Sequence, residues 1–234
     1  MEPRILVIEH EADAHLGYFA EWLGLPCDIV RPYLGDPVPP APEGAGLIVL
    51  GGEPSADEDD RYPWLRPTRA LLRRAVEAEV PTLGICLGAQ LLTLACGGEV
   101  RPGSHGLETG LLPVRRLPAA DADPLMRGVP ATALAVQWHK DAMTRLPEGA
   151  VPLATGDVYP AQAYRLGSCA WAVQFHPEAT YDIYESWMAG GAHKVTAAGL
   201  DPQRVLAQVK QVTDTWRPLA AAFADAVRAA AASR

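Results

Sequence analysis

Positive charge and paired cysteines are scarce in this sequence. Twenty lysines and arginines stand against 28 aspartates and glutamates, a formal net charge of −8, so no basic field is available to attract nucleic acid or an anionic membrane surface. The four cysteines, Cys27, Cys86, Cys96 and Cys169, show no C-x-x-C spacing. A chain of this length does not depend on disulfide bonds. We therefore expect reduced thiols in a cytoplasmic protein.

Long hydrophobic runs and a leader-type N-terminus are also missing. No stretch approaches the ~18 apolar residues that a membrane span needs, and MEPRILVIEH has no basic region followed by a long apolar run. We expect a soluble, intracellular protein. Of the 234 residues, 49% are hydrophobic, which is enough for the core of a single domain over residues 1–234.

Short apolar runs alternate with helix-like segments, a pattern that predicts an α/β fold with an open, mostly parallel sheet of the flavodoxin-like or Rossmann-like type and helices on both faces. After residue 99, strand-like pieces predict a mixed or antiparallel extension of this sheet. The segment at about 200–234 is predicted to be helical and interrupted at Pro218. We expect strands at 4–9, 27–33, 46–52 and 81–86, and helices at 12–24, 65–79 and 88–98.

The stretch PTLGICLGAQLLTLACGG places Cys86 between Gly84 and Gly88, where an apolar run changes into a helical pattern. This is the form of a nucleophile elbow, in which glycines let strand and helix approach closely. The N-terminus of the following helix favours the thiolate, and the N–H of Leu87 is expected to point at an oxyanion beside the sulfur. The alternative is that Cys86 packs in the core as a small hydrophobic residue. We interpret the other three cysteines as core residues of this kind.

A base for such a nucleophile is offered by WAVQFHPE at residues 171–178. Residues two apart in an extended chain face the same side, so His176 and Glu178 can point into one site. Pro177 keeps the segment extended. The imidazole can then take the proton of Cys86 while the carboxylate orients it.

Two further segments lie near the predicted site. LGGEPS at residues 50–55 is a Gly-Gly turn at the end of a strand, and Gly52 is the candidate for a second oxyanion donor. An ordinary tight turn is the alternative. The acidic run at residues 57–60 is interpreted as a solvated loop, and we expect no metal site there.

Together these segments resemble the class I (triad-type) glutamine amidotransferase family, and in particular its free-standing, single-domain members. GICLGAQLL is similar to the family's nucleophile segment and QFHPE to its His-x-Glu segment, in the same order along the chain. LGGEPSADEDDRYPWL is similar to the glycine loop and acidic segment of the free-standing members. The resemblance extends from about residue 4 to about residue 190.

The resemblance implies a thiolate that attacks the side-chain amide of glutamine, releases ammonia and leaves a γ-glutamyl thioester for water to hydrolyse. It implies Cys86 as the nucleophile, His176 as the general acid and base, and Glu178 as the residue that orients His176, with no cofactor and no metal. The residues implied for the oxyanion hole are Gly52 and Leu87, and those implied for substrate binding are Gln90, Gln137, Trp138 and His139.

Two positions depart from the family's pattern. Glu53 follows Gly51 and Gly52 where the family usually has proline, so that an acidic side chain is expected beside the oxyanion donor. Lys140 follows His139 where the family more often has glycine. If that glycine serves a positive φ, Lys140 would be strained.

Lysine occurs only at positions 140, 194 and 210, and none of the three lies in a G-x-x-x-x-G-K-[ST] loop. We therefore expect ammonia to pass to a separate synthetase or acceptor protein, with neither nucleic acid nor membrane as a partner. One alternative is a hydrolase of γ-glutamyl amides or peptides that uses the same Cys-His-Glu triad. The other is a non-catalytic binding protein on this fold, suggested only by Glu53 and Lys140.

Overall fold

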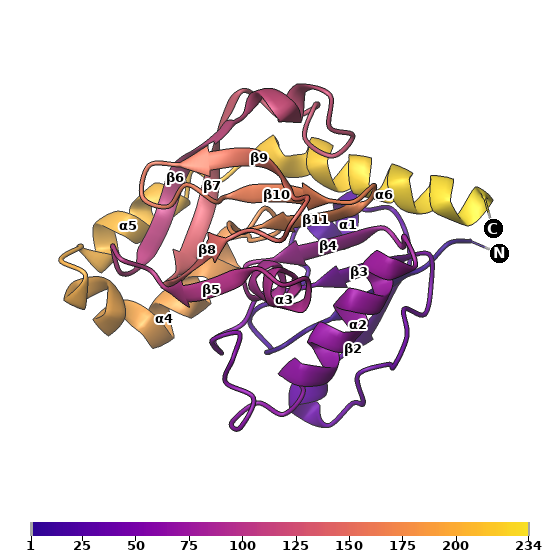
Figure 1. The fold of residues 1–234 in the computed structure, drawn as a ribbon. Helices are drawn as coiled ribbons and strands as arrows, with labels where there is room; N and C mark the ends of the chain where they lie inside the picture. Colours follow the sequence, from indigo (N-terminus) through magenta and orange to yellow (C-terminus); the bar gives the residue numbers. More distant parts are fainter. Residues whose placement is uncertain (1, 234) are drawn as a thin grey trace.

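The computed structural model describes residues 2–233, which fold around a nine-stranded mixed sheet (Figure 1). The strands follow the spatial order β2-β1-β3-β4-β11-β10-β9-β6-β7, and β5 and β8 form a separate two-stranded sheet. The strands are β1 (Ile5–Ile8), β2 (Cys27–Val30), β3 (Gly46–Val49), β4 (Thr82–Ile85), β5 (Glu99–Pro102), β6 (Glu108–Arg116), β7 (Thr132–His139), β8 (Asp141–Arg145), β9 (Val151–Gly156), β10 (Ala163–Leu166) and β11 (Ala170–Val173).

The five strands from β2 to β11 in this order are parallel. Strands β1, β3, β4 and β11 are buried at every position, as expected for strands that are covered on both faces. Because carboxyl ends of parallel strands meet at one edge of a sheet, the loops after these four strands converge there. The predicted α/β fold with a parallel core is confirmed.

Antiparallel strands continue the sheet beyond β11, as predicted. β10 pairs with β11, and β9, β6 and β7 follow in turn. Val136 of β7 also forms an isolated bridge with His176. The last strand of the extension, β7, therefore contacts the segment that follows β11.

Helices cover both faces of the sheet (Figure 1). Ile5 of β1 packs in one of three core clusters, with Phe19 and Phe223, whereas Leu6 packs in a second, with Leu72 and helix α3. Consecutive strand residues point to opposite faces, so the two clusters lie on opposite sides of β1. The helices are α1 (Phe19–Trp22), α2 (Leu65–Glu77), α3 (Leu87–Ala95), α4 (Tyr181–Ala197), α5 (Pro202–Val209) and α6 (Arg217–Ala232), with short 3-10 helices at Pro32–Leu34, Pro118–Asp121 and Asp214–Trp216.

The helix expected at 12–24 is reduced to α1. Gly17 has φ 48°, and a Cβ on it would collide with the Glu178 carbonyl oxygen. The Tyr18 N–H donates to the same oxygen at 2.9 Å. This close approach requires glycine and a turn instead of a helix, and it packs the loop after β1 against the segment that holds Glu178.

The C-terminal part of the chain also differs from the prediction. Pro218 lies in the first turn of α6 instead of interrupting it, a position at which the missing N–H of proline has no acceptor to lose. Trp216, Leu219 and Phe223 are almost fully buried, so this segment packs on the core. The assignment of residues 1–234 to one domain stays a prediction.

Helix α4 was not predicted, although its sequence carries the signal. Buried residues recur at positions 183, 184, 187, 188, 191 and 195, which is the spacing of one helix face. The Thr180 hydroxyl accepts a hydrogen bond from the Ile183 N–H at 3.3 Å and caps the first turn. The glycine pair at 190–191 hides this pattern, because glycine is unfavourable inside a helix.

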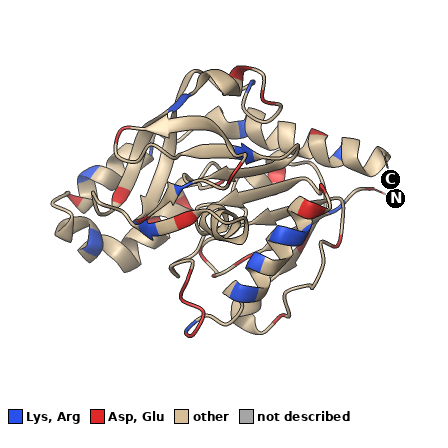
Figure 2. Ribbon diagram, viewed as in Figure 1, with Lys and Arg blue, Asp and Glu red and all other residues tan. Residues whose placement is uncertain are grey.

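Charged side chains of both signs are scattered over the molecule, and arginines follow one another along α2 (Figure 2). One of them, Arg69, is paired with Asp59 at 2.6 Å. Among the helices within residues 2–233, none is both long and apolar enough to cross a membrane.

Candidate active site

Cys86 lies between β4 and α3, at the carboxyl edge of the parallel strands. Its backbone has φ 50° and ψ −106°, a conformation that costs a non-glycine residue ~1–3 kcal/mol. A Cβ on Gly84 would lie 2.5 Å from the Gly88 carbonyl oxygen, and one on Gly88 would collide with the Val49 carbonyl oxygen. The structure thus contains the predicted strand-to-helix turn, with both flanking glycines required by close contacts.

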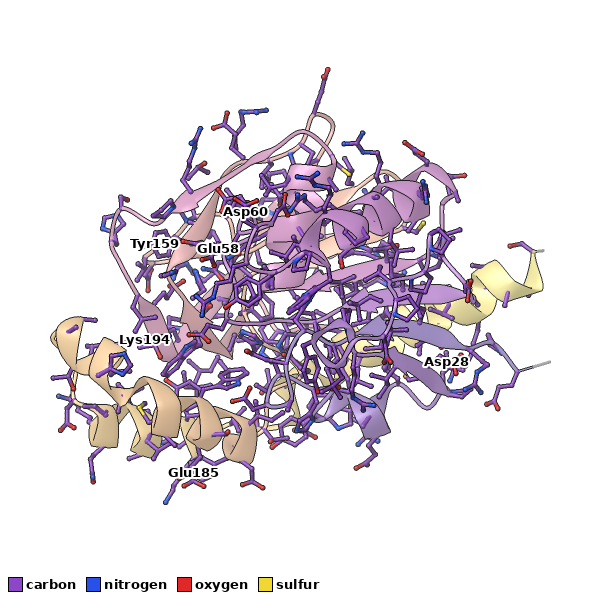
Figure 3. All side chains as sticks on the ribbon, turned by 90° about the horizontal axis from the view of Figure 1, so that it is seen from below. Asp28, Glu58, Asp60, Tyr159, Glu185 and Lys194 are labelled. Atoms are coloured by element: carbon purple, nitrogen blue, oxygen red, sulfur yellow. The ribbon has the colours of Figure 1, made fainter. Side chains whose placement is uncertain are left out.

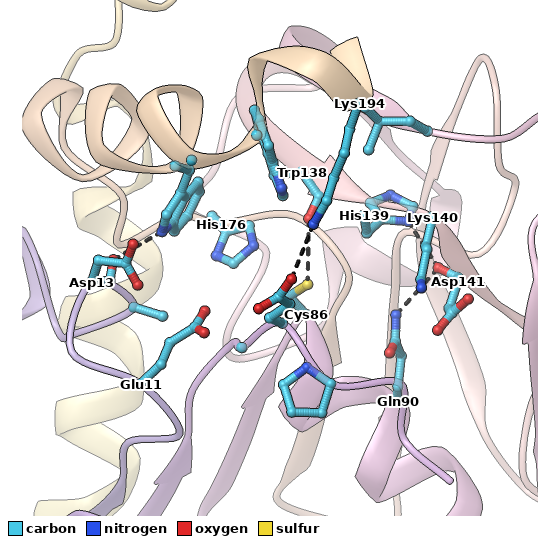
Figure 4. A pocket seen from close by; sticks show the side chains of 18 of the residues that line it. Glu11, Asp13, Cys86, Gln90, Trp138, His139, Lys140, Asp141, His176 and Lys194 are labelled. Carbon is cyan, nitrogen blue, oxygen red and sulfur yellow. Dashed lines mark hydrogen bonds and ion pairs between the residues drawn. The ribbon is translucent and has the colours of Figure 1, made fainter. Parts of the chain in front are cut away.

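His176 and Glu178 come from the loop after β11. His176 lies beside Cys86 at this edge of the sheet (Figure 4). His176 Nδ1 lies 2.7 Å from Glu178 Oε1, and both side chains are buried. The His176 N–H donates to the Val136 carbonyl at 2.8 Å, and Trp187 lies against the imidazole with 4.6 Å between ring centroids. Since Nδ1 is occupied by Glu178, Nε2 is the ring nitrogen left to exchange a proton with Cys86.

The electrostatics of this group favour an ion pair. Burial alone would lower the pKa of His176, because the imidazolium loses its hydration. The negative charges of Glu178 and of the Cys86 thiolate outweigh burial and raise this pKa from 6.5 to about 10. His176 is therefore charged at neutral pH, and an imidazolium beside a thiol favours the thiolate.

We expect the stability of the protein to fall at alkaline pH because of His176. Its pKa is about 10 in the folded protein and 6.5 when unfolded. Its contribution to the free energy of unfolding is thus complete below about pH 6.5 and lost as the pH rises through about 10. Urea unfolding across this window should show the decline, and His176→Gln should flatten it. Equal slopes in the two proteins would contradict the assignment.

The glycine loop after β3 closes on the same group. A Cβ on Gly51 would lie 2.7 Å from His176 Cε1 and 3.6 Å from Cys86 Cβ, and one on Gly52 would lie 3.2 Å from Leu87 Cδ2. The loop backbone therefore packs directly on the elbow. Leu87 is the first residue of α3, where a backbone N–H has no intrahelical acceptor. Both predicted oxyanion donors are brought to Cys86, and their role stays a prediction.

The two departures from the family pattern, Glu53 and Lys140, differ in what they do in the structure. Glu53 pairs with Lys194 of α4, with 3.1 Å between Oε1 and Nζ, and Lys194 reaches over Cys86 in Figure 4. Both side chains are largely exposed, so the pair adds little stability, but it joins the glycine loop to α4. Among the described non-glycine residues only Glu79 and Cys86 have a positive φ, so the strain considered for Lys140 is absent.

A cavity of about 590 Å³ opens beside Cys86. Of the residues predicted to bind substrate, Gln90, Trp138 and His139 line it. Gln137 does not, because its side chain lies fully buried elsewhere and donates from Nε2 to Gln162 Oε1 at 2.8 Å. Successive strand residues point to opposite faces, so the Gln137 side chain is turned away from the cavity. The role implied by the family resemblance is one of the backbone of this segment, and for Gln137 it stays a prediction.

His139 belongs to a second buried His–Glu pair. Its Nε2 lies 2.8 Å from Glu108 Oε2, and its Nδ1 lies 2.9 Å from the Asp141 carbonyl oxygen. Both ring nitrogens are occupied, so His139 has none free to accept a proton from Cys86. The structure thus places His139 in the cavity wall, and its implied role in substrate binding stays a prediction.

Helix α4 supplies cavity residues that sequence reasoning missed. Trp187 and Lys194 line the cavity, as does Gly191. A Cβ on Gly191 would collide with the Trp138 indole, so this glycine allows α4 to approach the end of β7. The sequence signal for these residues was the helical spacing of the apolar residues of α4, and the helix itself was not predicted.

Glu11 was also missed, although it lies three residues after the end of β1 and lines the cavity. Burial and the neighbouring charge of Asp13 raise the pKa of Glu11 to about 7, against a hydrogen bond from the Glu53 backbone that lowers it. A carboxyl group that titrates near neutral pH therefore faces Cys86 from the loop after β1 (Figure 4).

The acidic run at 57–60 is only partly a solvated loop. Glu58 lines the cavity and accepts a hydrogen bond from the Ser55 N–H at 2.7 Å, and Asp59 binds Arg69 with both oxygens. In Figure 3, Glu58 and Asp60 lie on the same side of the molecule as Lys194. Two of the four acidic residues thus shape the chain beside the cavity.

The class of protein follows from a comparison with known families. The family described as "Glutamine amidotransferase class-I" matches residues 23–189, which is more than half of the chain. The chain therefore belongs to the class-I glutamine amidotransferase family, and the predicted family is confirmed. The matched range includes Cys86, His176 and Glu178.

Individual proteins agree with this assignment. The chain is 37% identical over 142 residues to a glutamine-hydrolysing GMP synthase of Symbiobacterium thermophilum; the match covers 58% of the chain but only 25% of that relative. It is 29% identical over 189 residues to the glutamine amidotransferase-like protein YfeJ of Salmonella typhimurium, covering 78% of each. The crystal structure of a glutamine amidotransferase from Thermotoga maritima superposes with a TM-score of 0.83 at 25% identity, covering 97% of this chain and 99% of that one.

Proposed function

We propose that this protein hydrolyses the side-chain amide of glutamine through a thioester on Cys86 and releases glutamate and ammonia. The observation that carries the proposal is the grouping of Cys86 and His176 at the wall of one cavity, with the cysteine on an elbow and Glu178 bound to the histidine. Similarity to a glutamine-hydrolysing GMP synthase supports glutamine as the substrate.

The first half-reaction uses the ion pair. The Cys86 sulfur bonds to the amide carbon, and the carbonyl electrons move to oxygen, where the N–H groups of Gly52 and Leu87 stabilise the negative charge. His176 then gives its Nε2 proton to the amide nitrogen. The carbon–nitrogen bond breaks, ammonia leaves, and the γ-glutamyl thioester remains with a neutral His176.

The second half-reaction restores the enzyme. His176 Nε2 takes a proton from water while the hydroxide forms a bond to the thioester carbon. The carbon–sulfur bond breaks and the Cys86 thiolate returns beside a charged His176. The carboxylic acid formed loses its proton to solvent and leaves as glutamate. Glu178 holds the ring in place throughout, because Nδ1 must stay toward the carboxylate.

Gln90, Trp138 and His139 are proposed to bind the amino-acid end of the substrate. The Gln90 amide nitrogen already donates to the Asp141 carbonyl at 3.2 Å and to Gln174 Oε1 at 3.3 Å. Its oxygen is therefore the atom available to a substrate ammonium group. Trp138 contributes its main-chain carbonyl, which faces Cys86.

A separate acceptor is proposed for the ammonia. The chain covers only a quarter of the GMP synthase that it matches, so the similarity concerns one part of a longer enzyme. We infer that this chain supplies the glutamine-hydrolysing half of such a reaction and that another protein supplies the activated acceptor.

A γ-glutamyl amide or peptide is the second candidate substrate. The volume of the cavity, about 590 Å³, lies within the ~300–1,000 Å³ of pockets that enclose drug-sized ligands. Lys140 and Lys194 line it beyond the triad. The same thioester chemistry would then release an amine larger than ammonia.

The test is release of glutamate from the purified protein, supplied first with glutamine and then with a panel of γ-glutamyl amides, with Cys86→Ala as the control. Glutamate and ammonia from glutamine, lost in Cys86→Ala, is the expected result. Release from γ-glutamyl amides alone would favour the second candidate. No release from any substrate, and no thioester trapped on Cys86, would contradict both.

A further inference from the structure

We propose that Gln174 is a further catalytic residue, whose side-chain amide donates a hydrogen bond to the Cys86 thiolate and at the same time fixes Gln90. The inference deepens the proposed function and rests on it for the role of Cys86 as nucleophile.

The backbone places Gln174 beside the nucleophile. It follows the last residue of β11, and its side chain is fully buried. The Cys86 N–H donates to the carbonyl of the preceding Val173 at 2.9 Å, and the Gln174 N–H donates to the Gln162 carbonyl at 2.8 Å. Gln174 is thus held between β10 and the elbow, where its side chain has little freedom.

The orientation of the amide follows from its neighbours. The Asp141 carbonyl can only accept a hydrogen bond, so the Gln90 atom that faces it must be the NH₂ group. The same NH₂ group faces Gln174, which must present its oxygen there, at 3.3 Å. The other end of the Gln174 amide is then its NH₂ group, and this lies 3.8 Å from Cys86 Sγ. An N–H is therefore aimed at the sulfur.

The two polar contacts of the sulfur besides His176 favour opposite protonation states. A thiol S–H can donate to the Trp138 carbonyl, which lies 3.9 Å away, whereas a thiolate can only accept. The Gln174 N–H is a donor, and it stabilises the thiolate more than the thiol, because hydrogen bonds to charged groups are stronger than those to neutral groups. Gln174 therefore shifts the balance at Cys86 toward the nucleophilic form.

The same amide also positions Gln90. With its nitrogen bound by Asp141 and Gln174, Gln90 keeps its oxygen turned to the cavity. One buried side chain thus couples the reactivity of the sulfur to the placement of the proposed substrate contact. An apolar residue at position 174 would disturb both.

The test is the pH dependence of Cys86 alkylation by iodoacetamide, followed by mass spectrometry of the Cys86 peptide. Gln174→Met, which keeps the shape but removes the donor, should slow alkylation about 10- to 100-fold near neutral pH and move the midpoint to higher pH. Gln174→Glu, which places a carboxylate beside the sulfur, should move the midpoint at least as far. Thermal unfolding of each variant reports whether it is folded.

Gln162→Met is the matched control, because Gln162 is an equally buried glutamine whose side chain binds Gln137 and Glu108 instead of the thiol. It should leave the midpoint unchanged. A wild-type midpoint in folded Gln174→Met or Gln174→Glu would overturn the proposal. Alkylation needs no substrate, so a shifted midpoint in a protein that does not hydrolyse glutamine would support the role of Gln174 while the proposed function fails.

Discussion

Cys86→Gly is expected to abolish glutamine hydrolysis and yet to unfold at a higher temperature than Cys86→Ala. Removing the nucleophile should lower kcat/KM by more than about 10⁴-fold, as for other nucleophiles that act as one unit with their base. The stability difference has a separate origin in the backbone. Cys86 has φ 50°, which glycine adopts readily and alanine does not.

The order of the two variants reverses the usual one. Alanine is normally preferred to glycine within a helix or strand, because glycine loses more conformational freedom on folding. At Cys86 the strain of ~1–3 kcal/mol remains in Cys86→Ala and is relieved in Cys86→Gly. We expect Cys86→Gly to be about 1 kcal/mol more stable than Cys86→Ala.

Chemical unfolding of the two variants measures this difference, and Ala89→Gly is a suitable control. Ala89 lies in α3 three residues after Cys86 and is fully buried, so glycine there should be destabilising by about 1 kcal/mol. Equal stability of Cys86→Gly and Cys86→Ala would mean that the elbow stores no strain and that its conformation is set by the flanking glycines alone.

Much of the fold could be predicted from local pattern. The buried strands β1, β3 and β11 are continuous apolar runs, and β4 departs from this only at Thr82. The turn at Cys86 is specified by Gly84 and Gly88, where close backbone contacts leave no room for a Cβ. His176 and Glu178 were predictable because alternation in an extended chain decides which side chains share a side. These features are local, and a sequence records local constraints directly.

The rest of the site depends on contacts between distant segments. Gly17 removes the first part of the expected helix because it must approach Glu178, far along the chain. Lys194 enters the cavity only because α4 packs on Trp138 across Gly191. Gln174 was passed over because its importance lies in the direction of one amide, which the orientations of Gln90 and Asp141 determine.

Glu178→Gln is expected to lower kcat/KM for glutamine by about 10³- to 10⁴-fold, comparable to neutralising the carboxylate of a serine-protease triad. The carboxylate is what offsets the cost of burying a charged His176. An amide can keep a hydrogen bond to Nδ1 but carries no charge, so the pKa of His176 should fall. At neutral pH the imidazole would then be uncharged and unable to protonate the leaving nitrogen or to favour the thiolate.

Glu108→Gln separates this electrostatic effect from a merely structural one. Glu108 holds His139 at 2.8 Å, in a pair as buried as that of Glu178 and His176, but it does not contact the triad histidine. Both substitutions remove one buried carboxylate from a histidine, so both should lower stability. Only Glu178→Gln should also move the alkylation midpoint of Cys86 to higher pH and flatten the alkaline loss of stability. If Glu108→Gln changed the reactivity of Cys86 as much as Glu178→Gln did, the charge of Glu178 would not be the cause, and both carboxylates would act only by holding the cavity in shape.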